Sequence, residues 1–343
     1  MNTMNMLRRT VVGTIVGASL SLSLGLGVGL GVGIAALCLS HSAIAAAPMV
    51  KTSAPGYYRM MLGDFEVTAL SDGTVNLPME QLLKNSSTAA TAKAFEKYYL
   101  KSPIETSVNA YLINTGTKLV MIDAGAAGLF GPTLGNVLTN LKAAGYAPEQ
   151  IDEIYITHMH GDHVGGLMLG DKMAFPNALV RADKRDADYW LSQANLAKAA
   201  DGDKGAFQGA MVSLNAYVKA GKFIPFVGNT DLIPGVKARS SYGHTAGHTT
   251  FVVESKGEKL ALWGDLMHAA AVQFDNPAVT IAFDSDHKAA ARERASAYAD
   301  AAKHGYLVGA THVSFPGLGR LRATGAGKDK RYIWVPVNYT VMR

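Results

Sequence analysis

The amino-acid sequence predicts a single α/β domain in which mixed β-sheets are covered by helices. Apolar residues make up 48% of the 343 residues, enough to form a large core. Segments with the alternating or β-branched pattern of strands come in pairs across short turns, and segments with helical spacing lie between several of these pairs. We therefore expect strands arranged in hairpins, with helices packed on the sheets that they form.

The first strand signals lie before residue 123. Residues 64–70 alternate between apolar and polar side chains and end in Ser71-Asp72-Gly73, which predicts a hairpin turn. Residues 108–114 and 118–122 flank Thr115-Gly116-Thr117, which predicts a second hairpin.

The middle of the chain alternates between helix and strand signals. Residues 131–144 have helical spacing and stop at Gly145. Residues 151–156 and 180–183 are short apolar segments typical of buried strands, and a helix is expected over residues 190–199.

The last third repeats this alternation. Residues 251–254 and 260–263 form a predicted strand pair across Lys256-Gly257. The alanine-rich residues 289–303 predict a long helix.

The N-terminus has the three parts of an export signal. Arg8 and Arg9 precede an uncharged run from residue 11 to residue 50, and small residues at 42–47 offer an Ala-x-Ala cleavage site. We predict a signal peptide at residues 1–47 and a periplasmic or secreted domain at residues 48–343. The apolar run is long, so an uncleaved membrane anchor is the alternative. The route, general secretory or twin-arginine, stays open.

Charge and cysteine content argue against several classes of function. Arg8 and Arg9 are the only charged residues before residue 48, so the rest of the chain has a formal charge of +3. This charge is too small and too dispersed to indicate a nucleic-acid partner. The only cysteine, Cys38, lies inside the predicted signal, so the domain has no disulfide, no thiolate ligand and no cysteine nucleophile.

Three histidines and an aspartate fall within His158-Met159-His160-Gly161-Asp162-His163. Protonated imidazoles repel one another, and neutral buried imidazoles each need a partner. A divalent metal ion resolves both problems, because imidazole nitrogen and carboxylate oxygen are good ligands for it. His158 and His160 can face one ion, and Asp162 and His163 a second. A histidine-rich surface loop is the alternative, but the carboxylate and the preceding apolar strand argue against it.

The same run resembles the signature of the metallo-β-lactamase-fold hydrolases, and further motifs follow in that family's order. Residues 243–249 resemble its T-P-G-H turn, with Ala246 where proline is usual. The remaining matches are Gly264-Asp265-Leu266 to the G-D motif, Ala310-Thr311-His312 to the final ligand histidine, and Asp123-Ala124-Gly125 to the D-T-G turn. The resemblance implies an αββα sandwich, with two mixed β-sheets flanked by helices.

The resemblance also implies a centre of two divalent ions. The matched residues place one ion on His158, His160 and His248, the other on Asp162, His163 and His312, and Asp265 between them. Zinc is the first expectation for such a histidine-rich site, with manganese, iron and cobalt as alternatives. The ions would share a hydroxide that attacks the substrate, and Asp162 would pass a proton to the leaving alkoxide. Asp123 and His244 are interpreted as supporting residues.

Over residues 52–342 the chain looks most like the methyl parathion hydrolase branch of the fold, which also contains lactonases and dihydrocoumarin-type aryl-ester hydrolases. The segments that carry this resemblance are residues 52–59, 126–134 and 315–317. Three aromatic residues match the family's substrate pocket, with core packing as the alternative: Phe130, Trp190 and Phe207. Three others stand where methyl parathion hydrolases have Leu, Thr and Leu: His268, Ile281 and Phe283. For His268, hydrogen-bonded support of Asp265 and simple burial are the alternatives to substrate binding.

These departures favour a hydrolase that opens lactones or cleaves aryl or carboxylic esters, of the acyl-homoserine lactone or dihydrocoumarin type, with quorum quenching as the expected role. Organophosphate triester hydrolysis is the alternative. A metal-bound protein of this fold without hydrolytic activity is a third reading, and the complete ligand set argues against it. The expected partners are a small-molecule substrate and a second copy in a homodimer. No nucleic-acid partner, and no stable membrane partner after signal cleavage, is expected.

Overall fold

The computed structural model describes residues 47–340, and residues 52 onward form one compact unit. The predicted signal at residues 1–47 lies almost entirely outside this range. Within the described range, no helix combines the length and the apolar character needed to cross a bilayer.

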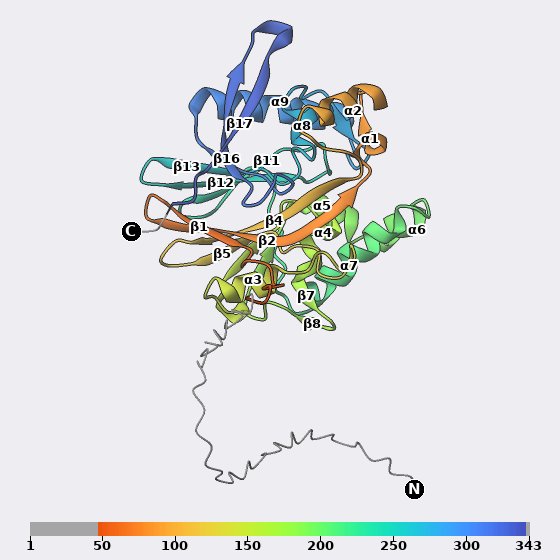
Figure 1. Ribbon diagram of the computed structural model, residues 1–343. Coiled ribbons are helices and arrows are strands. Elements are labelled where there is room, and N and C mark those ends of the chain that lie inside the picture. Colours follow the sequence, from red (N-terminus) through yellow and green to blue (C-terminus); the bar gives the residue numbers. More distant parts are fainter. Residues whose placement is uncertain (1–46, 341–343) are drawn as a thin grey trace, which may run out of the picture. The chain divides into compact units, whose positions relative to one another are not determined.

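The first sheet has six strands in the order β1-β2-β4-β5-β6-β9 (Figure 1). Their bounds are β1 Tyr57–Leu62, β2 Phe65–Leu77, β4 Ile104–Asn114, β5 Leu119–Ile122, β6 Glu153–Tyr155 and β9 Leu179–Arg181. The first four strands pair antiparallel, whereas β5, β6 and β9 run parallel. The hairpin across residues 115–117 and the strands within residues 151–156 and 180–183 are thus confirmed.

The predicted turn at Ser71-Asp72-Gly73 is wrong. Strand β2 continues through these residues and shifts its register on β4 between Ser71 and Gly73. Asp72 is the extra residue of this bulge, and its buried carboxylate accepts the backbone N–H groups of Ala126 and Val137. The turn-forming residues therefore serve to redirect one side chain rather than to reverse the chain.

The second sheet has seven strands in the order β10-β11-β12-β13-β15-β16-β17. Their bounds are β10 Thr230–Ile233, β11 Val236–Ser240, β12 Thr249–Ser255, β13 Glu258–Leu262, β15 Leu307–Gly309, β16 Leu318–Thr324 and β17 Arg331–Pro336. Only β13 and β15 pair in parallel. The strand pair predicted across Lys256-Gly257 is confirmed as β12 and β13.

Helices cover the outer faces of both sheets, and short elements complete the chain. The helices are α1 Met79–Leu82, α2 Thr88–Glu96, α3 Val137–Ala143, α4 Gly161–Val164, α5 Lys184–Trp190, α6 Gln193–Lys198, α7 Lys204–Lys219, α8 Ala270–Gln273 and α9 His287–His304. The short strands are β3 Leu83–Lys84 with β14 Thr280–Ile281, and β7 Met168–Leu169 with β8 Lys172–Met173. Turns of 3₁₀ helix lie at Pro148–Gln150, Gly165–Leu167 and Gly327–Asp329.

Three apolar clusters show how the layers are held together. One lies between the sheets and joins residues such as Val67 and Ile113 to Phe251 and Leu260. A second packs the first sheet against α3 and α7, and a third packs the second sheet against α9. Figure 1 shows α3, α4 and α7 on one side of the two sheets and α8 and α9 on the other. The predicted αββα sandwich is confirmed.

Two predicted helices differ in extent. The segment 131–144 is helical only from Val137, because Gly131 and Gly135 have positive φ angles of 93° and 95° that a helix does not allow. The helix expected at 190–199 is split into α5 and α6, since Ser192 caps the start of α6. The long helix α9 matches its prediction closely.

Candidate metal centre

The sandwich brings the carboxyl ends of three strands to one edge of the molecule. His158, Asp265 and His312 each lie three residues beyond a strand, after β6, β13 and β15 respectively. His244 lies in the loop between β11 and β12. Parallel neighbours end at the same edge of a sheet, so these side chains from distant parts of the chain converge.

Two glycines allow the histidine run to approach the neighbouring loop. A Cβ atom at Gly166 would stand 1.8 Å from the carbonyl oxygen of Ala124, and one at Gly165 would stand 2.2 Å from that of Ala126. The backbone N–H of Gly166 donates to the carbonyl of Gly125. The chain after α4 therefore packs against the loop of Ala124 to Ala126 by a close contact between backbones, which a side chain at either glycine would prevent.

A first group of possible ligands consists of His158, His160, His244 and Asp265. Nε2 of His244 lies 3.2 Å from Nε2 of His158 and 3.1 Å from Nδ1 of His160. The same nitrogen lies 3.3 Å from Oδ2 of Asp265. All four side chains are at least half-buried and point at one another.

A second group consists of Asp162, His163, Asp265 and His312. Oδ1 of Asp265 lies 3.1 Å from Nε2 of both His163 and His312. Oδ2 of Asp162 lies 3.6 Å and 3.5 Å from the same two nitrogens. Asp265 thus belongs to both groups: Oδ2 lies beside His244 and Oδ1 beside His163, while Nε2 of His312 lies within 3.2 Å of both oxygens, and a carboxylate shared in this way could bridge two ions.

His248, which the sequence analysis placed among the ligands, lies outside both groups, and His244 takes its place. Nε2 of His248 accepts the backbone N–H of Asp265 at 3.0 Å, and Nδ1 lies 2.9 Å from Oγ of Ser241. Both ring nitrogens of His248 are therefore engaged away from the cluster. The role of His248 as a ligand therefore stays a prediction: in this structure its ring holds the backbone of Asp265, while the nitrogen of His244 lies among the clustered side chains.

The donor atoms fit divalent metal ions. Ligands about 2.0–2.1 Å from a tetrahedral zinc ion lie about 3.3–3.4 Å from one another, close to the separations found here. Nε2 of His163 and Oδ1 of Asp265 are buried and have no hydrogen-bond partner among the described residues. Buried polar atoms rarely stay unpaired in a native protein. A cation between them would satisfy both atoms.

The charges and pKa values of the clustered side chains also fit a metal site. Burial lowers the pKa of His158 far below its ordinary value and that of His160 to about 3, so both imidazoles are neutral and keep a lone pair. Burial also opposes the charge on His244, but hydrogen bonds to Asp265 and Asp284 raise its pKa to about 9. Burial alone would raise the pKa of Asp265, yet His163 and His312 hold it well below its ordinary range. Without an ion, protons supply the positive charge that Asp265 requires, and an ion would displace them.

Each of several ligands is oriented through its other ring nitrogen. Nδ1 of His163 lies 2.8 Å from Oδ2 of Asp123, which also accepts the hydroxyl of Thr157. Nδ1 of His244 lies 2.8 Å from Oδ1 of Asp284. Nδ1 of His312 donates to the carbonyl of Ser107. Such contacts fix the tautomer and the direction of a metal-binding imidazole. The supporting role that the sequence suggested for Asp123 agrees with this geometry.

Two supporting residues escaped the sequence analysis. Asp186 is fully buried and accepts the N–H groups of Met159 and Gly247 and the hydroxyl of Thr245, so it ties both ligand loops together. Arg294 of α9 is also fully buried, donates to the carbonyl of Leu266 and approaches Asp284 at 3.7 Å. Neither residue lies in a distinctive sequence motif, so only its burial and its contacts in the structure indicate that it supports the ligand loops.

The six predicted pocket residues lie at different depths. Trp190 packs edge-on against His160, with ring centroids 5.3 Å apart, and Phe207 lies behind Trp190 in the core. Phe130 is half-exposed above Gly161, and Phe283 is 40% exposed beside His268. Ile281 is buried in a separate apolar cluster. Of the six, Trp190 contacts His160, Phe130 lies beside Gly161 and Phe283 lies beside His268, whereas Phe207 and Ile281 pack in apolar clusters.

His268 lies next to the bridging carboxylate. Its Nε2 is 3.0 Å from Oδ2 of Asp265, and its ring stacks on that of His312. The residue is buried, and its Nδ1 has no hydrogen-bond partner among the described residues. This geometry corresponds to the alternative in which His268 supports Asp265.

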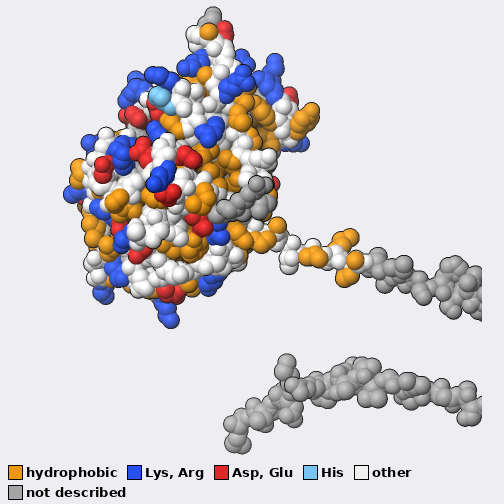
Figure 2. Space-filling view, turned by 90° about the vertical axis from the view of Figure 1, so that its left-hand side faces the viewer, with side chains coloured by type: hydrophobic (Ala, Val, Ile, Leu, Met, Phe, Trp, Pro, Cys, Tyr) orange, Lys and Arg blue, Asp and Glu red, His pale blue; other side chains and the backbone are white. Residues whose placement is uncertain are grey.

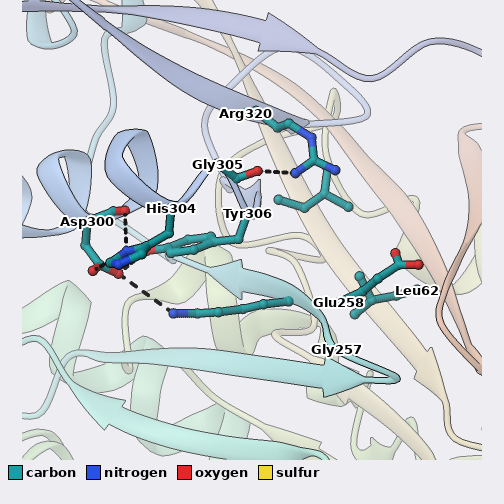
Figure 3. Close-up of a pocket in the computed structure, with 10 residues that line it drawn as sticks. Leu62, Gly257, Glu258, Asp300, His304, Gly305, Tyr306 and Arg320 are labelled. Carbon is teal, nitrogen blue, oxygen red and sulfur yellow. Dashed lines mark hydrogen bonds and ion pairs between the residues drawn. The ribbon is translucent and has the colours of Figure 1, made fainter.

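Two surface hollows lie elsewhere. One, of about 680 Å³, is bordered by Lys259, Asp300, His304, Tyr306 and Arg320 (Figure 3). In it the Asp300 carboxylate contacts His304, Tyr306 and Lys259, so its charges are already paired. The other, of about 580 Å³, lies on the outer side of the turn that carries His244. Neither contains a proposed ligand.

Comparison with known proteins identifies the family of this chain. A family model described as the Metallo-beta-lactamase superfamily matches residues 103–312, a range that contains all of the clustered ligands. The chain belongs to this superfamily. An N-acyl homoserine lactonase from a Bacillus species is 26% identical over 203 residues, which are 53% of this chain and 72% of that protein. A Beta-lactamase-like protein 2 homolog from Caenorhabditis elegans is 32% identical over 114 residues, so the match spans only 35% of that relative.

Solved structures of the metallo-beta-lactamase superfamily overlay well. The hydrolase AbOPH of the beta lactamase superfamily is 36% identical, with a TM-score of 0.79 over 84% of this chain and 100% of that one. AidC, a dizinc quorum-quenching lactonase, has a TM-score of 0.75 over 83% of this chain and 99% of its own, at 24% identity. The likeness to AidC shows the shared fold.

Proposed function

We propose that this chain is a dinuclear metal hydrolase that opens lactones or cleaves aryl and carboxylic esters. One observation carries the proposal: the Asp265 carboxylate belongs to two groups of possible ligands, with Oδ2 beside His244 and Oδ1 beside His163. His158, His160 and His244 form one group, and Asp162, His163 and His312 form the other. Zinc is the expected ion. The lactonase relatives support the choice of substrate class.

Two bound divalent ions would supply a Lewis acid for a carbonyl oxygen and a water molecule of lowered pKa. The chain's own residues arrange the rest. Asp162 is the most exposed carboxylate of the cluster, with 19% of its side chain accessible, so it can reach a substrate. It is placed to carry a proton to the leaving alkoxide oxygen as the ester bond breaks.

Three aromatic residues beside the cluster are the proposed substrate contacts. Trp190 lies against His160, Phe130 lies beside Gly161, and Phe283 lies near His268. An acyl chain or an aryl ring can cover these surfaces while its carbonyl group faces the ligands. Burial of this apolar area excludes water from the reacting bond.

A hydrolysis panel on the metal-loaded chain from residue 48 tests the proposal. The substrates are N-acyl homoserine lactones, dihydrocoumarin, aryl esters, methyl parathion and a cephalosporin. We expect turnover of lactones and aryl esters, with methyl parathion at most a slow substrate. Rapid methyl parathion hydrolysis with inert lactones and esters would favour the phosphotriesterase alternative. Metal analysis should give two ions per chain, and Asp265→Ala should lose both bound metal and activity.

The place of action is part of the proposal. The export signal predicted at residues 1–47 supports a periplasmic or secreted enzyme, and detection of the processed chain in the periplasmic fraction tests it. The homodimer expected from the resemblance is tested by sedimentation of the same sample.

A further inference from the structure

The last two strands form a hairpin that projects beyond the sandwich. Strands β16 and β17 pair antiparallel along their whole length, from Gly319 opposite Pro336 to Thr324 opposite Arg331. Figure 1 shows the hairpin extending past α9, and β17 is the edge strand of its sheet. One face of the hairpin packs on the core as far as the pair of Ala323 with Tyr332, whereas the other face has no such packing to explain its side chains.

The two faces of the hairpin differ sharply. The inner face is apolar and packed: Leu321 and Tyr332 are buried, and Trp334 stacks on Phe274 at 5.8 Å. The pairs on the outer face are Arg320 with Val335, Arg322 with Ile333, and Thr324 with Arg331. Ile333 and Val335 remain 50% and 46% exposed. The outer face thus carries three arginines beside two exposed aliphatic side chains and contains no acid. Arg320 donates to the Gly305 carbonyl, so Arg322 and Arg331 are the arginines that the proposal uses.

The hairpin also carries the net charge of the domain. Residues 318–336 contain five basic side chains and one acidic one, which leaves the rest of the chain after residue 47 with a formal charge of −1. Figure 2 shows Lys and Arg side chains gathered below the projecting tip. Arg322 and Arg331 form no ion pair with any residue of the described range. This is a localised positive surface on an otherwise nearly neutral domain.

We propose that the outer face of the β16–β17 hairpin binds reversibly to the surface of an anionic phospholipid bilayer. Arginines near such a surface are attracted to its headgroups, and exposed aliphatic side chains between them can enter the interface. A projecting hairpin can reach a flat surface without the domain blocking it.

Other occupants fit this face less well. A second copy docked face to face would set three arginines against three arginines, which is repulsive. A stable protein interface needs about 20–30 residues on each side, whereas the outer face offers six. Lipid headgroups require no shape match of that size.

Vesicle sedimentation tests the proposal with the chain from residue 48, which contains the compact unit that begins at Thr52. Vesicles with about one-third phosphatidylglycerol in phosphatidylcholine should bind the protein, vesicles of phosphatidylcholine alone should not, and about 0.5 M salt should release it. Arg322→Glu with Arg331→Glu should weaken partitioning about tenfold or more. Hydrolysis of a water-soluble substrate should not change.

The matched control is Lys93→Glu with Lys142→Glu, which makes the same change in charge at two exposed helical sites. This variant should bind almost as well as wild type. Equal weakening in both double variants would mean that only overall charge matters and would overturn the proposal. So would failure of the wild-type chain to bind anionic vesicles, or a dimer that Arg322→Glu with Arg331→Glu dissociates. Folding of each variant is checked by its thermal transition.

Discussion

Asp265 is the residue on which the arrangement of the centre depends. Its carboxylate is buried, and its oxygens lie 3.1–3.3 Å from imidazole nitrogens of His163, His312 and His244. Its backbone is held in turn by His248 through the N–H group. The side chain and the backbone of one residue are thus fixed by different histidines, and the roles of these histidines can be separated by experiment.

We expect the two histidines of the 243–249 turn to differ in metal binding. His244→Ala should remove an inward-facing nitrogen, leave at most one ion per chain, and lower kcat/KM about 100-fold or more. His248→Asn should keep two ions, because neither group of clustered side chains includes His248. Elemental analysis after dialysis measures both, with exposed His287→Ala as the control. Loss of metal in His248→Asn but not in His244→Ala would restore the sequence-based assignment.

His248 also makes the stability of the metal-free protein depend on pH. Burial, reinforced by His244, lowers its pKa from 6.5 to about 3. Between pH 6.5 and about 3, His248 is therefore protonated in the unfolded chain but not in the folded one. The contribution of neutral His248 to the unfolding free energy is full above pH 6.5 and is lost as the pH falls toward 3. In urea titrations of metal-free protein, His248→Asn should lose less unfolding free energy than wild type between pH 6.5 and about 4.5. Equal losses would show that His248 is not the titrating group.

At the scale of elements, helix α9 supports the centre from outside the sheets. Arg294 projects from it into the core and donates to the carbonyls of Leu266, Pro277 and Val279. It also lies 3.7 Å from Asp284, the residue that orients His244. One buried side chain therefore connects the helix to the segment after Asp265 and to the support of a ligand.

Loss of the Arg294 contacts should lower the unfolding free energy. Arg294→Met leaves Asp284 buried without its cation, so we expect the unfolding free energy to fall by about 3–5 kcal/mol. Exposed Arg292→Met, on the same helix, should change it by less than about 0.5 kcal/mol. Urea denaturation of both variants makes the comparison. A loss below about 1 kcal/mol for Arg294→Met would show that the surrounding carbonyls are easily rehydrated.

The position of the loop after α4 depends on one residue, Gly166, which leaves room for the Ala124 carbonyl. Gly166→Ala should push the histidine run away from Ala124 and lower the unfolding free energy by about 1–3 kcal/mol. Gly205→Ala, in α7 where an added Cβ meets nothing within 4 Å, should instead raise it by about 0.5–1 kcal/mol. Denaturation curves that show no difference between the variants would mean that the loop moves freely.

For the whole molecule, the centre joins the two sheets of the sandwich. His158, His160 and His163 follow the first sheet, whereas His244, Asp265 and His312 belong to the second. Ions shared between them would add a link across the layers to the apolar cluster that already lies there. Metal binding and global stability should therefore change together.

Chelation measures this coupling. Removal of metal should lower the Tm, and zinc at about 100 times its Kd should restore about 2.7 kcal/mol of stability. In Asp265→Asn the difference between chelated and zinc-loaded protein should largely vanish. If the variant keeps the full zinc-dependent shift in Tm, the ions are held without the bridging carboxylate.

The spacing of residues along the chain predicts a metal-binding histidine run and several strand pairs, and the family resemblance implies the αββα layers. Three histidines and an aspartate within six residues indicate a metal site because ligand type and spacing are local properties. Strand pairing across short turns is also local, which is why the hairpins at 115–117 and 256–257 are confirmed. Only the tertiary structure separates His244, whose nitrogen lies in the cluster, from His248, whose ring nitrogens contact Asp265 and Ser241, since both lie in one turn. It also distinguished buried Asp186 from Asp188, which pairs with Lys184 on the surface. Burial depends on contacts between segments that are distant in the sequence, so it cannot be predicted from the local spacing of residues.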